Sequence, residues 1–301
     1  MAGCNCPSHT KSEVQFGDYF SENIYSWCTN CGNYGIHAAV KRALVSSQIR
    51  PCQALLCFDI GCHGNGSDKI GGYRFHGLHG RVIPFACGAA IANRRTKVIA
   101  FGGDGGTFGE GINHLIMAIR GNYEVMFVFH NNLNYGLTLG QASATTKRGV
   151  KMNASPDGIT SDPINPMEFV LSQSPSFAAR TFSGDIAHMT ETFEKGLSHK
   201  GFAFIEVLQS CPTFNLMTPH EWYQQRIKDI KKIKSYNPHN LDAAKKIALD
   251  LEKQIAVGVL YQNPKSLPFM ERQANRQGIK TELVDEVKSI SVKNLLDAFR
   301  K

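Results

Sequence analysis

The most constraining feature of this sequence is the segment Gly103-Asp104-Gly105, which is followed after 25 intervening residues by Asn131-Asn132. The apolar run Lys97–Phe101 has the length of a buried strand, and the glycine-rich segment Gly102–Gly106 predicts a tight turn. From Gly109 to Arg120 the apolar residues recur at helical spacing. The region therefore predicts a strand, a turn and a helix in that order.

A second buried strand is predicted at Val125–Phe129, which completes a strand–helix–strand unit. A right-handed crossover makes the two strands parallel, so the loops that carry Asp104 and Asn131-Asn132 open on the same carboxyl edge of the sheet. An aspartate beside a phosphate-binding turn would repel the phosphates unless a hard divalent cation lay between them. The N–H groups of Gly105 and Gly106 could hold those phosphates. These residue types predict a site for Mg²⁺ and a diphosphate.

Two alternatives compete with this interpretation of the glycine-rich segment. A Rossmann-type dinucleotide site would need a third glycine where Phe108 stands, and it would leave Asp104 without a role. A plain strand–turn–helix without any ligand is also compatible with the spacing. Taken together, the segment resembles the thiamine-diphosphate motif, in which the same two groups of residues occur at this spacing. That resemblance implies Asp104, Asn132 and the backbone oxygen of Asn134 as the Mg²⁺ ligands.

The cysteine content is the second strong signal, because the chain has nine cysteines in 301 residues. The segment Met1–Phe20 is polar and lacks the apolar centre of a signal peptide, and we find no apolar stretch that could span a bilayer. We therefore expect a cytoplasmic protein with reduced thiols and no membrane association. In such a compartment, Cys28 and Cys31 in a Cys-x-x-Cys pair are typical of a metal or redox site.

Four of the cysteines lie near the ends of predicted elements. Cys28 and Cys31 precede a predicted helix at Ile36–Val45, Cys62 follows a predicted strand at Ala54–Ile60, and Cys211 follows one at Phe202–Leu208. Four thiolates could therefore converge at the edge of the sheet. Both zinc and a cubane iron–sulfur cluster accept four thiolates, and the residue types alone leave the two open.

The remaining five cysteines carry less information. Cys52, Cys57 and Cys87 lie in apolar surroundings, so we expect them to be small buried hydrophobic residues. Cys4 and Cys6 lie in a terminal segment, where they could bind an accessory metal or simply belong to a disordered end.

With these motifs in place, the sequence from about Tyr25 to about Tyr261 resembles the β subunits of the 2-oxoacid:ferredoxin oxidoreductases. The matching segments are Trp27–Gly32, Ile60–Cys62, His76–Arg81, Gly103–Gly105, His130–Asn132, Tyr135–Ser143 and Cys211–Asn215. The resemblance implies an α/β fold, with a parallel sheet flanked by helices that forms the diphosphate-binding half of a thiamine-diphosphate site. It also implies oxidative decarboxylation of a 2-oxo acid with coenzyme A, or the reverse carboxylation, with ferredoxin as the electron carrier.

The resemblance further implies roles for single residues. Cys28, Cys31, Cys62 and Cys211 would be the ligands of one [4Fe–4S] cluster. His79 would lie near the cofactor as a candidate catalytic residue, without an assigned proton transfer, whereas His76, His114 and His130 are interpreted as structural. The residues that would line the thiamine diphosphate are Ile60, Gly61, Cys62, His63, His79, Gly105, Gly106, Gly136 and Leu137.

One departure from the family pattern concerns the substrate. Many relatives place a basic residue three positions after the cysteine that corresponds to Cys62, whereas this chain has Asn65. We expect Asn65 to lie near the substrate, where it cannot pair with a carboxylate as a cation would. The segment Cys211–Asn215 favours 2-oxoglutarate slightly over pyruvate or other 2-oxo acids, and a non-oxidative thiamine-dependent decarboxylase remains the alternative.

The pattern along the chain predicts three parts. Residues 1–24 form an N-terminal extension, and residues 25–218 form the α/β domain that carries the predicted site. Residues 219–301 are expected to be a helical extension that packs on this domain or on partner chains. Helices are predicted there at Trp222–Lys234, at Leu241–Gln254 and near Val292–Phe299.

The single diphosphate-binding half and the net charge of this sequence both indicate partner chains. The chain contains one diphosphate-binding half, so the resemblance implies a separate α chain, possibly fused to a γ-type domain, in an αβ or (αβ)2 assembly. The net charge of +8 comes from scattered basic residues without a nucleic-acid recognition motif, so we expect no nucleic acid. An acidic ferredoxin fits this charge better, with Arg226–Lys234 as the candidate docking patch.

Overall fold

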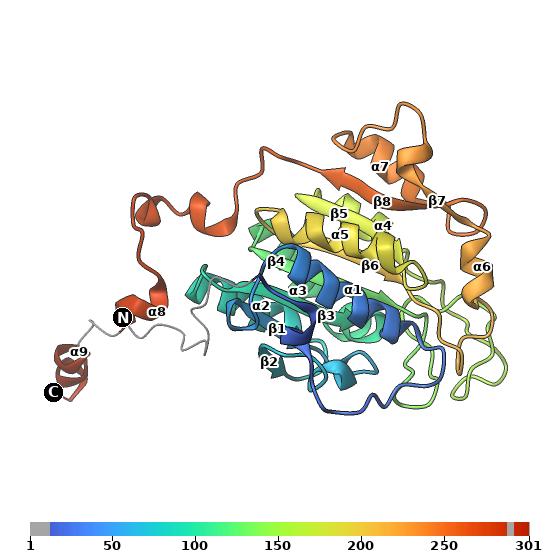
Figure 1. Cartoon of the computed structure of the whole chain (residues 1–301), viewed down its shortest axis with the longest axis horizontal. Helices are drawn as coiled ribbons and strands as arrows, with labels where there is room; N and C mark the ends of the chain where they lie inside the picture. Colours follow the sequence, from blue (N-terminus) through green and yellow to red (C-terminus); the bar gives the residue numbers. More distant parts are fainter. Residues whose placement is uncertain (1–12, 288–291, 301) are drawn as a thin grey trace.

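The structure is a computed structural model that describes residues 13–287 and 292–300, so Cys4 and Cys6 lie outside the described residues. Within these ranges the chain forms one eight-stranded sheet with the order β2-β1-β3-β4-β6-β5-β8-β7 (Figure 1). The strands are β1 (Ala54–Phe58), β2 (Tyr73–His76), β3 (Lys97–Gly103), β4 (Val125–Asn131), β5 (Phe177–Phe182), β6 (Ala203–Leu208), β7 (Ile227–Asp229) and β8 (Ile255–Gln262). Neighbouring strands are parallel except for the antiparallel pair of β5 and β8.

Helices cover both faces of this sheet. The helices are α1 (Gly32–Ser46), α2 (Val82–Ala92), α3 (Ile112–Gly121), α4 (Pro166–Ser172), α5 (Ile186–Ser198), α6 (His220–Gln224), α7 (Leu241–Ala248), α8 (Leu283–Glu286) and α9 (Lys293–Phe299). One hydrophobic cluster joins the sheet to α2, α3, α4 and α7, and a second joins its other face to α1 and α5. The parallel sheet with flanking helices predicted from the sequence is therefore confirmed.

The central strands show why a continuous apolar run is required. In β3, Val98 and Ala100 belong to the cluster of α2 and α3, whereas Ile99 and Phe101 belong to the cluster of α1 and α5. Successive side chains of a strand point to opposite faces, so a strand buried on both faces must be apolar at every position.

The predicted tight turn at Gly102–Gly106 is wrong. Strand β3 continues to Gly103, and Gly105–Glu110 forms a short π-helix that leads into α3. The glycine at position 102 serves packing, because a Cβ atom there would lie 2.8 Å from the ring of Phe127. Close approach to a neighbouring strand, and not a turn, explains this glycine.

The predicted all-helical C-terminal part is also wrong. The segment expected as a helix at Trp222–Lys234 contains the short helix α6, strand β7 and a 3₁₀ turn. Strand β8 follows and pairs with β5, so the sheet continues beyond the predicted α/β domain. The reason is tertiary, since β5 would otherwise present an unpaired edge. The final helix predicted near Val292–Phe299 is confirmed as α9.

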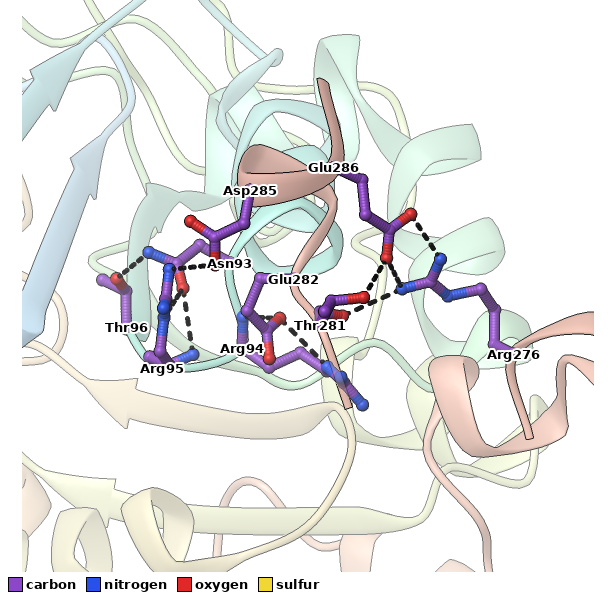
Figure 2. Close-up of polar contacts among 9 residues, drawn as sticks. All are labelled: Asn93, Arg94, Arg95, Thr96, Arg276, Thr281, Glu282, Asp285 and Glu286. Carbon is purple, nitrogen blue, oxygen red and sulfur yellow. Dashed lines mark hydrogen bonds and ion pairs between the residues drawn. The ribbon is translucent and has the colours of Figure 1, made fainter. Parts of the chain in front are cut away.

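After β8 the chain returns along the amino ends of the strands (Figure 1). Phe269 stacks on Tyr123 with ring centroids 4.5 Å apart, and its N–H donates to the Asn122 carbonyl at 2.9 Å. Figure 2 shows the end of this segment, where Glu282 accepts from Arg94 Nε at 3.1 Å. We call residues 263–287 the C-terminal strap.

Within the described ranges, no helix is long and apolar enough to cross a membrane.

Candidate functional site

The candidate site is a pocket at the carboxyl ends of β1, β3 and β4. It is an open pocket with a cavity volume of about 60 Å³, and five parts of the chain form its wall. The lining residues are Ile60, Gly61, Cys62, His63, His79, Gly103, Asp104, Gly105, Gly106, His130, Asn132, Asn134, Tyr135, Gly136, Leu137, Thr138 and Gln209. The structure thus brings together every residue predicted to line the cofactor and all three predicted Mg²⁺ ligands. Asn65 is not among the lining residues and is half-buried in a 3₁₀ turn at Gly64–Gly66.

Asp104 is held by hydroxyl groups from a separate loop. Its Oδ2 accepts from Ser143 Oγ at 2.6 Å and from Thr145 Oγ1 at 2.7 Å, and its Oδ1 accepts from Gly105 N at 3.0 Å. The residue is only 2% exposed, and burial raises the pKa of its carboxyl to about 6. A position in a loop suggests exposure to solvent, but the surrounding residues bury this carboxylate. A buried carboxylate with little compensating charge is a good position for a divalent cation.

The asparagine loop after β4 is tightly constrained. Leu133 has a left-handed backbone with φ 61°, a conformation that costs a non-glycine residue roughly 1–2 kcal/mol. The Leu133 carbonyl accepts from Thr146 Oγ1 at 2.8 Å, and the Asn132 carbonyl accepts from Asn215 Nδ2 at 3.1 Å. Asn132 Oδ1 also accepts from Asn134 N at 3.2 Å. Such strain persists where surrounding contacts over-determine the loop, which is common at functional sites.

The glycines of the pocket allow close packing behind the predicted phosphate site. A Cβ atom at Gly105 would lie 2.1 Å from the ring of Tyr135, and one at Gly106 would lie 2.2 Å from Asp59 Oδ2. The N–H of Gly105 is already bonded to Asp104. Gly106 is therefore the better placed of the two predicted phosphate donors.

Asp59 and Glu110 flank His79, and the sequence analysis missed both. His79 Nδ1 lies 3.3 Å from Glu110 Oε2. Asp59 is 1% exposed, and its Oδ1 accepts from the N–H groups of Ile60 at 2.9 Å and Gly80 at 2.8 Å. Burial raises the pKa of Asp59, while these two N–H groups and His79 oppose that rise. The available signal was a carboxylate directly after a buried strand.

Two stacked imidazoles form the floor between the predicted diphosphate and thiol regions. His63 and His130 stack with ring centroids 5.0 Å apart, and His130 Nδ1 lies 2.9 Å from Gln209 Oε1. Burial lowers the pKa of His130 to about 4 and that of His63 well below its usual value. Both rings are therefore neutral near pH 7. His130 was interpreted as structural, but it contributes to the wall of the pocket.

The four predicted cluster cysteines lie within electrostatic reach of one another beside this pocket. Burial raises the pKa of Cys62 to about 12, and the thiols of Cys31, Cys211 and Cys28 add to that rise. Cys211 Sγ lies 3.9 Å from Asn134 Oδ1, and Cys31 Sγ lies 3.9 Å from Gln209 Nε2. The predicted convergence of four thiols from three separate segments is therefore seen.

The spacing of these thiols bears on what they could bind. Among the described residues, no group of three or more His, Cys, Asp or Glu side chains is arranged to hold a single metal ion. Four cysteine thiolates would suit either zinc or a cubane iron–sulfur cluster. Of the other cysteines, Cys57 and Cys87 are buried as predicted. Cys52 is half-buried and disulfide-bonded, which differs from the buried free thiol that we predicted.

Comparisons with known proteins agree with this site. Residues 59–207 match the family model of the thiamine pyrophosphate enzyme C-terminal TPP binding domain, and residues 211–277 match the C-terminal model of the pyruvate ferredoxin oxidoreductase β subunit. The β subunit of 2-oxoacid:ferredoxin oxidoreductase 1 from Aeropyrum pernix is 36% identical over 267 residues, which cover 86% of this chain and 84% of the relative. The chain belongs to the 2-oxoacid:ferredoxin oxidoreductase β-subunit family.

Two further proteins support the membership in this family. The β subunit of the 2-oxoacid:ferredoxin oxidoreductase from Saccharolobus solfataricus is 36% identical over 261 residues, covering 83% of this chain and 86% of the relative. The 2-oxoglutarate:ferredoxin oxidoreductase from Magnetococcus marinus, solved with 2-oxoglutarate, coenzyme A and succinyl-CoA bound, aligns with a TM-score of 0.85 at 28% identity. That alignment covers 97% of this chain and 98% of the other. The resemblance found in the sequence is therefore confirmed.

Proposed function

We propose that this β subunit binds Mg²⁺ and thiamine diphosphate in the pocket, and one [4Fe–4S] cluster on Cys28, Cys31, Cys62 and Cys211. The reaction is the coenzyme A-dependent oxidative decarboxylation of a 2-oxo acid, with electrons delivered to ferredoxin. The observation that carries the proposal is the position of Cys62. Cys62 lines the same pocket as the predicted Mg²⁺ ligands, and its thiol lies near the thiols of the other three cysteines.

The predicted binding regions of the two cofactors adjoin each other at Gly136 and Asn134. A Cβ atom at Gly136 would lie 3.2 Å from Cys62 Sγ and 3.2 Å from Asn134 Oδ1. Gly136 thus allows the thiol and the predicted magnesium loop to approach closely. When bound, thiamine diphosphate would supply a nucleophilic carbon for the 2-oxo group and a thiazolium ring that takes up the electron pair left by the loss of CO2. A nearby cluster shortens the path that these electrons must travel.

The residues of this chain perform binding and positioning. Asp104, Asn132 and the backbone oxygen of Asn134 would supply the hard oxygen ligands that Mg²⁺ prefers, and Gly106 N–H would donate to the diphosphate. The neutral rings of His63 and His130 form a buried wall that adds no charge next to the diphosphate. His79, placed between Asp59 and Glu110, is the candidate for holding or moving a proton at the pocket.

A partner chain is required by the proposal. The pocket contains the residues predicted to bind the diphosphate, and the described part of the chain forms one α/β sheet, with no second unit for the aminopyrimidine ring. Exposed apolar side chains gather near the pocket, with Leu78 77% and Leu139 65% exposed. An α subunit that covers them would complete the active site in an αβ or (αβ)2 assembly.

Among substrates we favour 2-oxoglutarate, which is bound in the structure of the Magnetococcus marinus enzyme.

The test is cofactor and substrate analysis of the purified assembly. We expect thiamine diphosphate, Mg²⁺ and about four iron atoms for each β chain. Reduction of ferredoxin should depend on coenzyme A and be fastest with 2-oxoglutarate when several 2-oxo acids are compared. Zinc in place of iron, or turnover without any electron acceptor, would contradict the proposal. The β chain alone should be inactive and should regain activity when mixed with the α chain.

A further inference from the structure

Three fully buried polar side chains run across the centre of the sheet toward the asparagine loop. Arg180 on β5 and Glu206 on β6 are paired in register and are both 0% exposed, with Arg180 Nε 2.7 Å from Glu206 Oε2. The other carboxylate oxygen, Glu206 Oε1, accepts from Asn131 Nδ2 at 2.8 Å. Asn131 is the last residue of β4 and directly precedes the predicted Mg²⁺ ligand Asn132.

The bond to Glu206 fixes the asparagine loop from the side of the sheet. The left-handed Leu133 follows two residues after Asn131, so the strained part of the loop begins close to this anchor. Thr146 and Asn215 fix the loop from two other loops. The Asn131 carbonyl also accepts from Gln209 N at 2.9 Å, which continues the pairing of β4 with the chain after β6. A loop with strained backbone keeps its geometry only while such anchors persist.

The ion pair is not explained by stability alone. Burying two charges is costly, and apolar residues of similar volume often replace such a pair without loss of stability. Arg180 Nη1 and Nη2 have no hydrogen-bond partner in the described part of the structure. Its one recorded bond goes to Glu206. A carboxylate held in the charged form accepts shorter and stronger hydrogen bonds than a neutral group does.

We propose that Glu206, paired with Arg180, is a positioning residue for the Mg²⁺ ligands. It holds the Asn131 side chain, and through it the start of the loop that presents Asn132 and the Asn134 carbonyl. The inference rests on the proposed function, since it concerns the affinity of that same site for Mg²⁺. Outer partners that orient metal ligands typically change metal affinity ~10- to 100-fold when they are removed.

The decisive variant is the double substitution Arg180→Met and Glu206→Met in the full assembly with the α chain. It removes both charges and keeps long side chains in the core, but it leaves Asn131 Nδ2 without its acceptor, so the melting temperature should fall no more than in a variant that loses one buried hydrogen bond. The bond to Asn131 is lost, so the Mg²⁺ concentration that gives half-saturation with thiamine diphosphate should rise ~10- to 100-fold. Equilibrium dialysis of thiamine diphosphate at a series of Mg²⁺ concentrations measures this value without requiring turnover.

Two further variants separate positioning from a purely structural role. Asn131→Ala breaks the same bond but leaves the ion pair intact, so it should raise the Mg²⁺ requirement to a similar extent. Ser176→Ala is the matched control, because Ser176 Oγ donates to the buried Asn122 at 2.6 Å at the opposite edge of the sheet. It should lower the melting temperature and leave the Mg²⁺ requirement unchanged.

The outcomes are distinguishable. A wild-type Mg²⁺ requirement in Asn131→Ala, or in a folded double variant, would overturn the role of Glu206 while leaving the proposed function intact. A rise of equal size in Ser176→Ala would show that any loss of stability weakens the site, which also overturns it. A wild-type assembly that binds thiamine diphosphate equally well without Mg²⁺ would refute the metal site itself.

Discussion

The amino ends and the carboxyl ends of the parallel strands, which we call the amino edge and the carboxyl edge of the sheet, differ in how completely the chain satisfies its own polar groups. At the amino edge, Asn122 has a left-handed backbone with φ 56°, and its side chain bonds to Ser176, Phe202, Ser266 and Leu267. At the carboxyl edge, buried polar atoms of several residues lack a partner within the described ranges. These atoms are Asp59 Oδ2, His63 Nε2, His130 Nε2 and Asn131 Oδ1.

An unpartnered buried polar atom costs ~1–3 kcal/mol, so the carboxyl edge is maintained at the expense of stability. The strap secures the amino edge, where Glu282 accepts from both the backbone N–H and the side chain of Arg94 (Figure 2). In the strap, Arg276 Nε is also buried without a hydrogen-bond partner among the described residues. The carboxyl edge has more such atoms, and it is where we propose that the cofactors and the α subunit bind.

The largest effect is expected from Asp104→Ala at the carboxyl edge. Mg²⁺-dependent binding of thiamine diphosphate should be abolished, because the loop loses its charged metal ligand. The variant should also lose ~1–3 kcal/mol of unfolding free energy, because Ser143 and Thr145 lose their acceptor. Asp104→Asn keeps an acceptor and serves as the control for stability. Thiamine diphosphate affinity close to that of the wild type would remove the metal-site argument.

Cys211→Ser should separate the two cofactors of the carboxyl edge. Thiamine diphosphate binding should remain largely intact, whereas electron delivery to ferredoxin should stop because the cluster loses a ligand. Iron analysis and a ferredoxin-reduction assay on the same sample measure both effects. Cys87→Ser is a matched control, since Cys87 is buried in the core away from the pocket. Normal ferredoxin reduction by Cys211→Ser would show that Cys211 is misassigned.

Asn65→Lys tests how far the substrate region extends beyond the pocket of this chain. A cation placed well enough to pair with the distal carboxylate of 2-oxoglutarate would contribute ~1.5–3 kcal/mol. The ratio of kcat/KM for 2-oxoglutarate to that for pyruvate should then rise roughly 10- to 100-fold. Asn65 does not line the pocket of the isolated β chain. An unchanged ratio would place this residue outside the substrate site of the assembly as well.

Glu282→Ala should affect stability at the amino edge and leave the chemistry unchanged. Glu282 is 8% exposed, and its removal leaves Arg94 without its carboxylate, so the free energy of unfolding should fall by ~1–3 kcal/mol. The control Asp285→Ala removes an exposed partner of Arg95 and should cost ~0–1 kcal/mol. Chemical denaturation measures both. A large loss of cofactor affinity in Glu282→Ala would contradict the independence of the two edges.

The smallest effect concerns ferredoxin docking on the basic patch Arg226–Lys234. Lys231 contacts Glu191, which offsets part of the positive charge of this patch. Replacing Lys232 and Lys234 by Gln should raise the KM for ferredoxin several-fold at low salt. The difference should vanish as salt rises, because screening acts over ~8 Å at physiological ionic strength. A KM that is insensitive to salt would indicate a solvated surface without a docking role.

Much of the fold and of the site could be predicted because the signals are local. The strand before Asp104, the helix after it and the strand before Asn131 each show their own periodicity. The parallel crossover then brings the loop residues together by a general rule of chain geometry. The cysteines could be located at the ends of elements in the same way. Asp59 had a local signal, as a carboxylate directly after a buried strand, but Glu110 and the pair of Arg180 and Glu206 could not be found because their partners lie far along the sequence.

The sequence by itself determined the two strands and the helix between Lys97 and Asn131, although not the shape of Gly102–Gly106, since hydrophobic periodicity and motif spacing are properties of the chain read in order. Only the tertiary structure decided that β8 extends the sheet beyond β5 and that Asp104 is buried. It also decided that Glu206 bonds to Asn131, 75 residues away. The physical reason is that burial, edge pairing and buried ion pairs depend on which segments pack together, and local patterns carry no record of that packing.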